Sequence, residues 1–143
     1  MEIKIPSNKK ALFESITEVI DTRYFDNLAT VLINKKEESI TIIAGKPPLC
    51  SHSKFTLDKS SSPVKDTQFS IDGSFIKQLP NYSSKDEDIE FSVHTSFSNA
   101  TSVELIHKDT KSNENALRRC ECVDVYEAHL TYLKESAQRP TST

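Results

Sequence analysis

Residues 1–20 read MEIKIPSNKKALFESITEVI, and this stretch decides the fold that the sequence predicts. Apolar and polar residues alternate from Met1 to Pro6, which is the period of a half-buried strand. From Ser7 onward, apolar residues recur at spacings of three and four, which predicts an amphipathic helix near Ser7–Thr22. A strand followed directly by a helix therefore opens the chain.

The same order returns in the second half of the chain, where residues 68–80 read QFSIDGSFIKQLP. The first four of these residues are typical of a short strand. Asp72 is expected to cap the helix that follows, and Pro80 is expected to end it. Strand-like alternating runs come after each helix, so the pattern of one strand, one helix and further strands is written twice.

These patterns predict an α+β fold, a duplicated strand-helix-strands unit with antiparallel sheets. We expect a single domain over residues 1–135, with half-repeats at about 1–58 and 67–133. The polar stretch Lys59–Pro63 is interpreted as the linker between the halves, and residues 136–143 as a flexible tail. The apolar faces predict these core residues: Leu12, Ile16, Leu32, Ile42, Phe69, Phe75 and Val93.

Composition excludes several classes of protein. The 143 residues carry a net charge of −3, whereas a domain that wraps nucleic acid normally has a basic excess. Two glycines are too few for a Gly-rich phosphate loop. No apolar run approaches the roughly 18 residues needed to span a membrane, and no hydrophobic leader precedes Pro6. A cytoplasmic protein is therefore expected.

The three cysteines, Cys50, Cys120 and Cys122, are interpreted as reduced thiols, because their number is odd and no export signal is present. Cys120 and Cys122 could supply two metal ligands, with His107 or His129 completing the set. One residue separates Cys120 from Cys122, whereas two residues separate the cysteines of the usual zinc knuckle, and the sequence has no second closely spaced pair of cysteines. Structural cysteines are favoured, and neither a metal nor a cofactor is expected.

No catalytic motif is present. The four histidines, among them His52 and His94, are scattered along the chain, and the acidic pairs Glu37-Glu38 and Asp86-Glu87-Asp88 fall at expected loop tips. Arg118-Arg119 could grip a phosphate or a carboxylate, but charged residues that protect a strand edge explain it more simply. The chain is therefore not expected to be an enzyme.

The order of the expected elements resembles that of a DNA sliding-clamp domain, most closely a domain of the bacterial DNA polymerase III beta clamp. The matching stretches are Met1–Ile5, Leu12–Ile20, Leu28–Ile33, Ser39–Gly45 and Phe69–Leu79. An unrelated α+β domain with the same order of elements is the alternative. The resemblance implies that the short helices face duplex DNA inside a ring and that their basic residues meet phosphates.

The basic residues that match this role are Lys9, Lys10 and Lys77. Acidic neighbours on the first helix, such as Glu14 and Glu18, oppose phosphate binding, because sequence-independent affinity comes from phosphate neutralisation. One chain supplies one such domain, so a ring would need self-assembly or another protein. We expect weak DNA binding, or none, by the lone chain.

Two functions remain open. The first is a non-enzymatic accessory or interaction protein with a sliding-clamp-like fold, linked to DNA replication or repair through protein partners or self-assembly. The alternative is a small intracellular inhibitor or immunity-type module that binds one protein and is unrelated to DNA. In both, a strand edge or a groove is the expected working surface.

Overall fold

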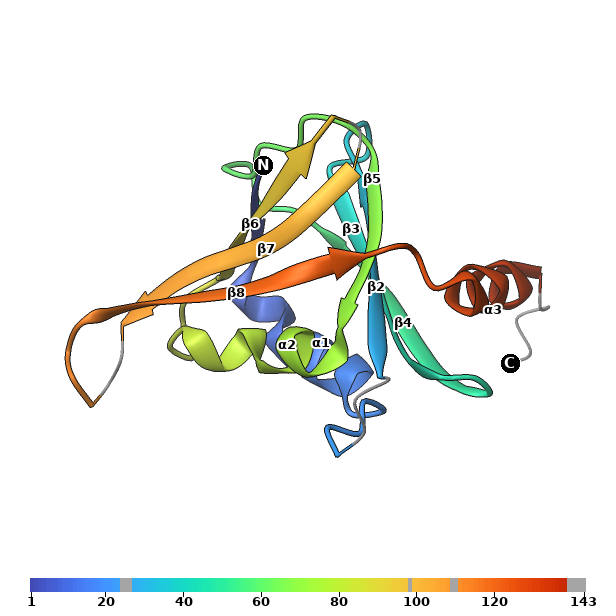
Figure 1. The fold of residues 1–143 in the computed structure, drawn as a ribbon, viewed down its shortest axis with the longest axis horizontal. Coiled ribbons are helices and arrows are strands. Elements are labelled where there is room, and N and C mark those ends of the chain that lie inside the picture. The colour runs from blue at the N-terminus through green and yellow to red at the C-terminus, as the bar shows by residue number, and fades with distance from the viewer. Residues whose placement is uncertain (24–26, 98, 109–110, 139–143) are drawn as a thin grey trace.

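The computed structural model describes residues 1–23, 27–97, 99–108 and 111–138, and strands dominate it. Eight described strands form one antiparallel sheet in the order β1-β6-β7-β8-β5-β2-β3-β4 (Figure 1). Their bounds are β1 (Glu2–Ile5), β2 (Leu28–Asn34), β3 (Ser39–Lys46), β4 (Leu49–Thr56), β5 (Thr67–Asp72), β6 (Ile89–Ser96), β7 (Asn99–Lys108) and β8 (Asn115–Val123).

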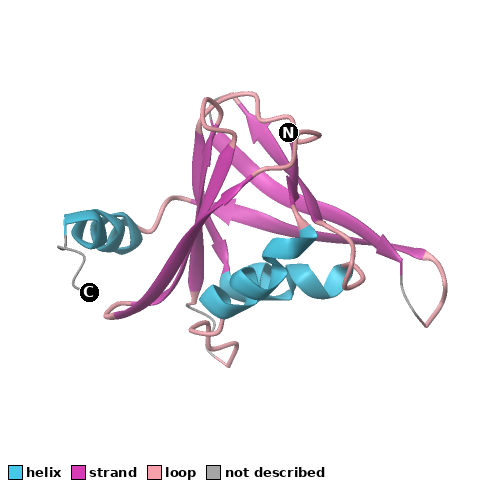
Figure 2. Cartoon of the chain, turned by 180° about the vertical axis from the view of Figure 1, so that it is seen from behind, coloured by secondary structure: helices cyan, strands magenta, loops and turns pink. Residues whose placement is uncertain are grey.

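Three short α-helices accompany the sheet in the described chain. A 3-10 turn, η1 (Ser7–Lys9), leads into α1 (Lys10–Thr17), and α2 (Gly73–Gln78) continues into a second 3-10 turn, η2 (Leu79–Tyr82). The last helix is α3 (Glu127–Gln138). α1 and α2 pack against each other, whereas α3 lies apart from them on the other side of the sheet (Figure 2).

Local sequence explains where α2 begins and ends. The Asp72 carboxylate accepts a hydrogen bond from the Ser74 amide at 2.9 Å, which confirms Asp72 as the cap. Pro80 follows in the tighter η2 turn, as a residue without an amide hydrogen should. α1 ends at Thr17, short of the predicted Thr22, and the Thr17 hydroxyl donates back to the Phe13 carbonyl at 3.0 Å.

Residues 58–62 link the two ends of the sheet. β1 and β4 are its two end strands, and the chain leaving β4 crosses to the outer edge of β1. The Asp58 and Ser62 amides donate to the carbonyls of Lys4 and Glu2, at 2.9 and 2.8 Å. In return the Lys4 amide donates to the Ser61 hydroxyl at 2.8 Å. Residues 58–62, hereafter the closing segment, thus cover an edge that would otherwise be unpaired.

The predicted α+β fold is wrong. The chain is mainly strands in one nearly closed, barrel-shaped antiparallel sheet, and it is not clearly a pair of sliding-clamp-like strand-helix-strands units. Each half of the chain gives its first strand to the other half, because β1 pairs with β6 and β5 pairs with β2. Alternation along one strand does not reveal its partner, so the sequence pattern could not show this exchange.

The core lies between the inner face of the sheet and the pair α1–α2. Of the predicted core residues, Ile16, Ile42, Phe69 and Val93 are buried, which confirms them. Leu12 is 41% exposed, so its prediction is wrong. Leu32 and Phe75, which are only half-buried, also depart from the prediction.

Neighbours take the places of the three misassigned residues. In α1 the buried face is formed by Phe13, Ile16 and Thr17, which leaves Leu12 at its margin. In α2 Ile76 is the buried residue, rather than Phe75. In β2 the inner positions belong to Val31 and Ile33, and strict alternation turns Leu32 to the outer face.

Candidate protein-binding surface

The predicted DNA-contacting lysines do not form a common basic surface. Lys10 is buried, and its ammonium donates to the Ser83 hydroxyl at 2.7 Å and to the Ser84 carbonyl at 2.5 Å. The Lys77 ammonium donates to the Ile20 carbonyl at 2.9 Å. Lys9 is exposed at the end of η1. Two of the three cations are therefore already engaged inside the chain.

A long two-stranded projection is the most distinctive surface feature. It consists of residues 104–108 of β7 and 115–119 of β8, hereafter the arm, which extend away from the body of the sheet (Figure 1). β8 pairs with β7 from Asn115 to Glu121 but with β5 only at Cys122 and Val123. Within the described chain, residues 115–121 of β8 therefore lack a second strand partner, and this edge of β8 is open.

One face of the arm carries two exposed apolar side chains. Ile106 and Leu117 lie directly opposite each other in the register and are 69% and 59% exposed. Beside them, Arg119 forms ion pairs with Glu104 at 3.6 Å and with Glu121 at 3.1 Å. Paired exposed apolar residues within a charged rim are typical of a contact surface rather than of scattered surface residues.

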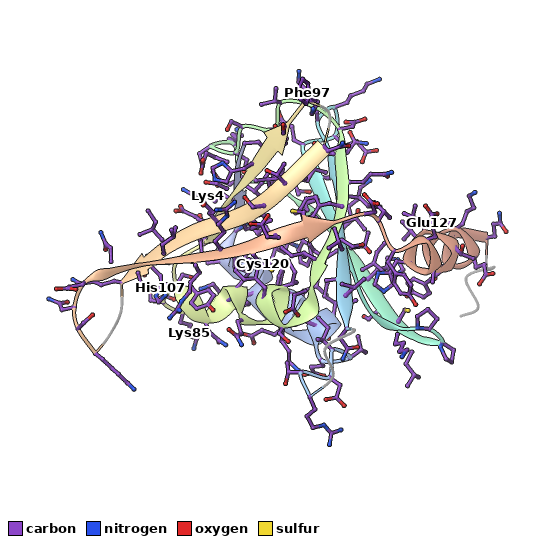
Figure 3. The ribbon with its side chains drawn as sticks, viewed as in Figure 1. Lys4, Lys85, Phe97, His107, Cys120 and Glu127 are labelled. Carbon is purple, nitrogen blue, oxygen red and sulfur yellow. The ribbon has the colours of Figure 1, made fainter. Side chains whose placement is uncertain are left out.

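The opposite face of the arm rests on η2. The His107 ring stacks on Tyr82 with centroids 4.7 Å apart, and the Arg118 guanidinium lies 5.8 Å from the centre of the same tyrosine ring. Arg118 Nε also donates to His107 Nε2 at 3.1 Å. Figure 3 shows His107 toward the outer part of the arm and Cys120 nearer the body. This stack fixes one face and leaves the edge and the Ile106 face accessible.

A cavity of about 820 Å³ opens beneath the arm, between it and the loop that follows η2. Three of its four carboxylates serve the fold. Asp88 accepts the Ser7 amide at 2.8 Å, and Glu90 forms an ion pair with Lys4 at 2.9 Å. Hydrogen bonds from the Ser84 hydroxyl and amide lower the pKa of Glu87. These bonds to the backbone, to a hydroxyl and to a lysine give the three carboxylates a structural role.

The cysteines are free thiols in the structure. Burial raises the pKa of all three, that of Cys122 to about 12, so each is a weak nucleophile near neutral pH. Among the residues that the structure describes, no cluster of three or more His, Cys, Asp or Glu side chains is arranged to hold a metal ion. His129, the suggested partner of Cys120 and Cys122, is engaged elsewhere.

His129 has a buried, hydrogen-bonded setting that the sequence did not reveal. It is fully buried under α3, where Nδ1 lies 2.6 Å from the Thr30 hydroxyl and Nε2 lies 2.7 Å from the Gly45 carbonyl. A helical spacing of Tyr126, His129 and Leu133 was the available signal. The hydrogen-bond partners come from strands 99 and 84 residues earlier, so that signal alone did not identify them.

Comparisons with known proteins leave the function to be argued from geometry. A scan against protein-family models finds no match, and a search of curated proteins finds no similar sequence. None of the helices in the described ranges has the length and apolar character needed to cross a membrane.

Proposed function

We propose that this chain is a non-enzymatic protein-binding module whose working surface is the open edge of β8 in the arm. The observation that carries the proposal is the unpaired run of residues 115–121, flanked by the exposed pair Ile106 and Leu117. An open strand edge offers backbone donors and acceptors to a further strand, and neighbouring side chains supply specificity.

The arm suits this role better than the other sheet edges do. The closing segment already covers the outer edge of β1. The outer edge of β4 has no strand partner in the described chain, but α1 and α3 lie beside this strand. β8 projects beyond the helices and has one side free in the described chain. A strand of the partner would pair with β8, extend the β7–β8 sheet and place one of its apolar side chains in contact with Leu117.

Charged residues beside the edge explain how it avoids indiscriminate pairing. Arg118 and Arg119 lie on the open strand, and charge on an edge strand disfavours aggregation. Arg119 is balanced by Glu104 and Glu121, and Arg118 lies against Tyr82 and His107. A partner must therefore offer complementary polar groups as well as an extended backbone.

Three partner classes fit this surface: a replication or repair factor, a second copy of the chain, and an unrelated protein that the module inhibits. Each would contribute an extended segment. A cytoplasmic setting accords with the three free cysteines, because reducing compartments keep thiols unpaired.

The test is a selection of extended peptides of about ten residues, displayed as a library and captured on the immobilised full chain. Selected peptides should shift the backbone amide resonances of residues 115–121 in two-dimensional NMR. Ile106→Lys and Leu117→Lys should each weaken binding about tenfold, since both remove apolar contact at the centre of the surface.

Val64→Lys is the matched control. Val64 is 65% exposed, close to the 69% of Ile106, but it lies in the loop before β5. This variant should bind the peptides as the wild type does. The proposal fails when the peptides shift resonances elsewhere, or when both arm variants retain wild-type affinity. Sedimentation velocity of the same proteins separates self-association from binding of a different partner.

A further inference from the structure

α3 is held on the outer face of the sheet by polar as well as apolar side chains. It contacts β3 and β4, and His129 is the one residue within this helix that is fully buried. Its leucines, Leu130 and Leu133, are only half-buried. Because no apolar residue of this helix is fully buried, its docking also depends on the hydrogen bonds that its polar residues make.

Those bonds form a continuous chain. The Tyr126 amide donates to the Ser70 hydroxyl at 2.8 Å, and that hydroxyl lies 2.7 Å from the hydroxyl of Thr30. Thr30 in turn lies 2.6 Å from His129 Nδ1, and His129 Nε2 lies 2.7 Å from the Gly45 carbonyl. Four bonds thus tie α3 and the segment before it to β5, β2 and β3.

The two groups at the ends of this series of hydrogen bonds determine which atom is the donor in each bond. The Tyr126 amide can only donate and the Gly45 carbonyl can only accept, so His129 Nε2 carries a hydrogen. In the neutral ring Nδ1 must then accept from Thr30, which leaves the Thr30 oxygen to accept from Ser70. Each donor in the chain meets one acceptor only when His129 is neutral.

Gly45 makes this arrangement possible. Its φ of +100° lies in the region that favours glycine, and a Cβ at this position would come within 2.2 Å of the Leu49 carbonyl oxygen. The backbone can therefore turn its carbonyl to His129 without a side-chain clash.

A second histidine contributes to the docking. His52 Nδ1 on β4 lies 2.9 Å from the Tyr132 hydroxyl, and the two rings meet edge to face with centroids 5.3 Å apart. α3 is thus fastened at two points one helical turn apart, and an imidazole takes part in each.

We propose that α3 is a detachable cover of the sheet, docked while His129 is neutral and released when this histidine gains a proton in mild acid. A proton on Nδ1 would clash with the hydrogen that the Thr30 hydroxyl donates. Nδ1 would then have to donate to Thr30, and Thr30 would have to donate to Ser70, which reverses both bonds. The reversed chain leaves the Ser70 hydroxyl without an acceptor among the groups that form it, and it places a positive charge in a buried site.

The groups around His129 offer little compensation for that charge. β2 contributes Thr30 and β5 contributes Ser70, neither of which is charged. β3 contributes the Gly45 carbonyl, and Tyr126 presents its ring at 4.8 Å. The neighbouring elements carry further titratable or charged residues, among them Cys50 and His52 on β4, Asp72 at the end of β5, Lys46 at the end of β3, and Glu127 and Tyr132 on α3.

None of these neighbours is a carboxylate bonded to the histidine. Asp72 instead caps α2, and Glu127 is exposed. Burial lowers the pKa of His129, and its bond to Gly45 only partly opposes this. His129 therefore resists protonation while α3 is docked, whereas in the released helix it is protonated near its ordinary pKa of about 6.5.

The direction of the pH effect follows from this difference. Above about pH 6.5 both forms are neutral, and docking is unaffected by pH. As the pH falls further, the released form binds a proton first, so the equilibrium moves toward release. Release would expose Ile43, which is fully buried on the same face of the sheet as Thr30.

Hydrogen exchange of the full chain, corrected for intrinsic rates, tests the proposal at about pH 7.5 and about pH 5. Protection of residues 127–138 should fall about tenfold or more in acid, while protection of β6 and β7 is retained. His129→Gln cannot titrate, and protection of α3 in this variant should not depend on pH. His94→Gln removes an exposed histidine paired with Glu104 and should respond like the wild type.

Three results would each overturn the proposal. The first is equal protection of α3 at both pH values in the wild type. The second is a parallel loss over β6 and β7, which would mean global unfolding. The third is a wild-type acid response in His129→Gln. Thr30→Val provides a further check, because loss of the hydroxyl should reduce protection of α3 already at neutral pH.

Discussion

Lys10 is a buried cation whose ammonium is satisfied by a hydroxyl and a carbonyl from the loop after η2. His129 is satisfied in the same manner from the opposite side of the sheet. Among the described residues, no buried side-chain nitrogen or oxygen lacks a hydrogen-bond partner. Single polar residues therefore fasten helices to distant parts of this chain, at positions where an apolar residue would ordinarily be expected.

At the residue scale, Ile16 is expected to contribute far more to stability than Leu12. Ile16 is 4% exposed, so Ile16→Ala should lower the free energy of unfolding by about 2–5 kcal/mol through lost burial and a cavity. Urea denaturation measures this loss.

Leu12→Ala is the matched variant on the same helix. Because Leu12 is 41% exposed, its truncation should cost less than about 1 kcal/mol. Equal losses for the two variants would show that the buried face of α1 is assigned incorrectly.

At the element scale, periodicity predicted elements better than it predicted their partners. The strand at β1 and the capped helix at α2 follow directly from local spacing, as does burial of Ile16. The pairing of β1 with β6 depends on contacts between residues about 90 positions apart, which no local pattern encodes. Lys59–Pro63 resembled a linker because it is polar, whereas part of it binds β1.

The candidate surface was predicted only in outline. Arg118-Arg119 was recognised as a charged strand edge, and the structure places both residues on the open strand. The opposition of Ile106 and Leu117 depends on the register of β7 and β8, which alternation along either strand does not reveal. The predicted lysines were chosen from the faces of two helices, but the acceptors of Lys10 and Lys77 lie on other segments.

The closing segment gives the element-scale prediction. The Ser61 and Ser62 hydroxyls accept the amides of Lys4 and Glu2, at 2.8 and 3.2 Å. Replacing both serines by alanine should lower the free energy of unfolding by about 1–3 kcal/mol, because two strand amides lose their acceptors. Exchange of the Lys4 amide, followed by NMR, should become faster.

Ser60→Ala serves as the control for these serines. The Ser60 hydroxyl donates to Asp58 at 2.7 Å and has no described bond to β1, so the Lys4 amide should exchange as in the wild type. Unchanged exchange in the double variant would mean that these hydroxyls do not hold β1.

At the scale of the whole molecule, charge opposes a direct role on DNA. The net charge is −3, and Lys10 and Lys77 are occupied by acceptors within the chain. We expect no detectable binding of duplex DNA at physiological salt, measured by fluorescence anisotropy. At low salt, Lys9→Ala should reduce the salt slope of any residual binding by about 0.9, the loss of one phosphate contact.

Lys85→Ala is a suitable control for Lys9→Ala, since Lys85 is also exposed but belongs to the loop after η2. Tight, salt-sensitive binding by the monomer that Lys9→Glu abolishes would restore a direct DNA role.

The exchange of first strands between the two halves also bears on how the chain folds during synthesis. β1 leaves the ribosome well before its partner β6, which is made some 90 residues later. At about 5–20 residues per second, β1 waits several seconds without a partner. The β2–β3–β4 meander can form meanwhile from local contacts, but the barrel cannot close. The newborn chain therefore presents an unpaired apolar strand for which a chaperone, or an early pause in translation, would matter more than it does for the finished protein.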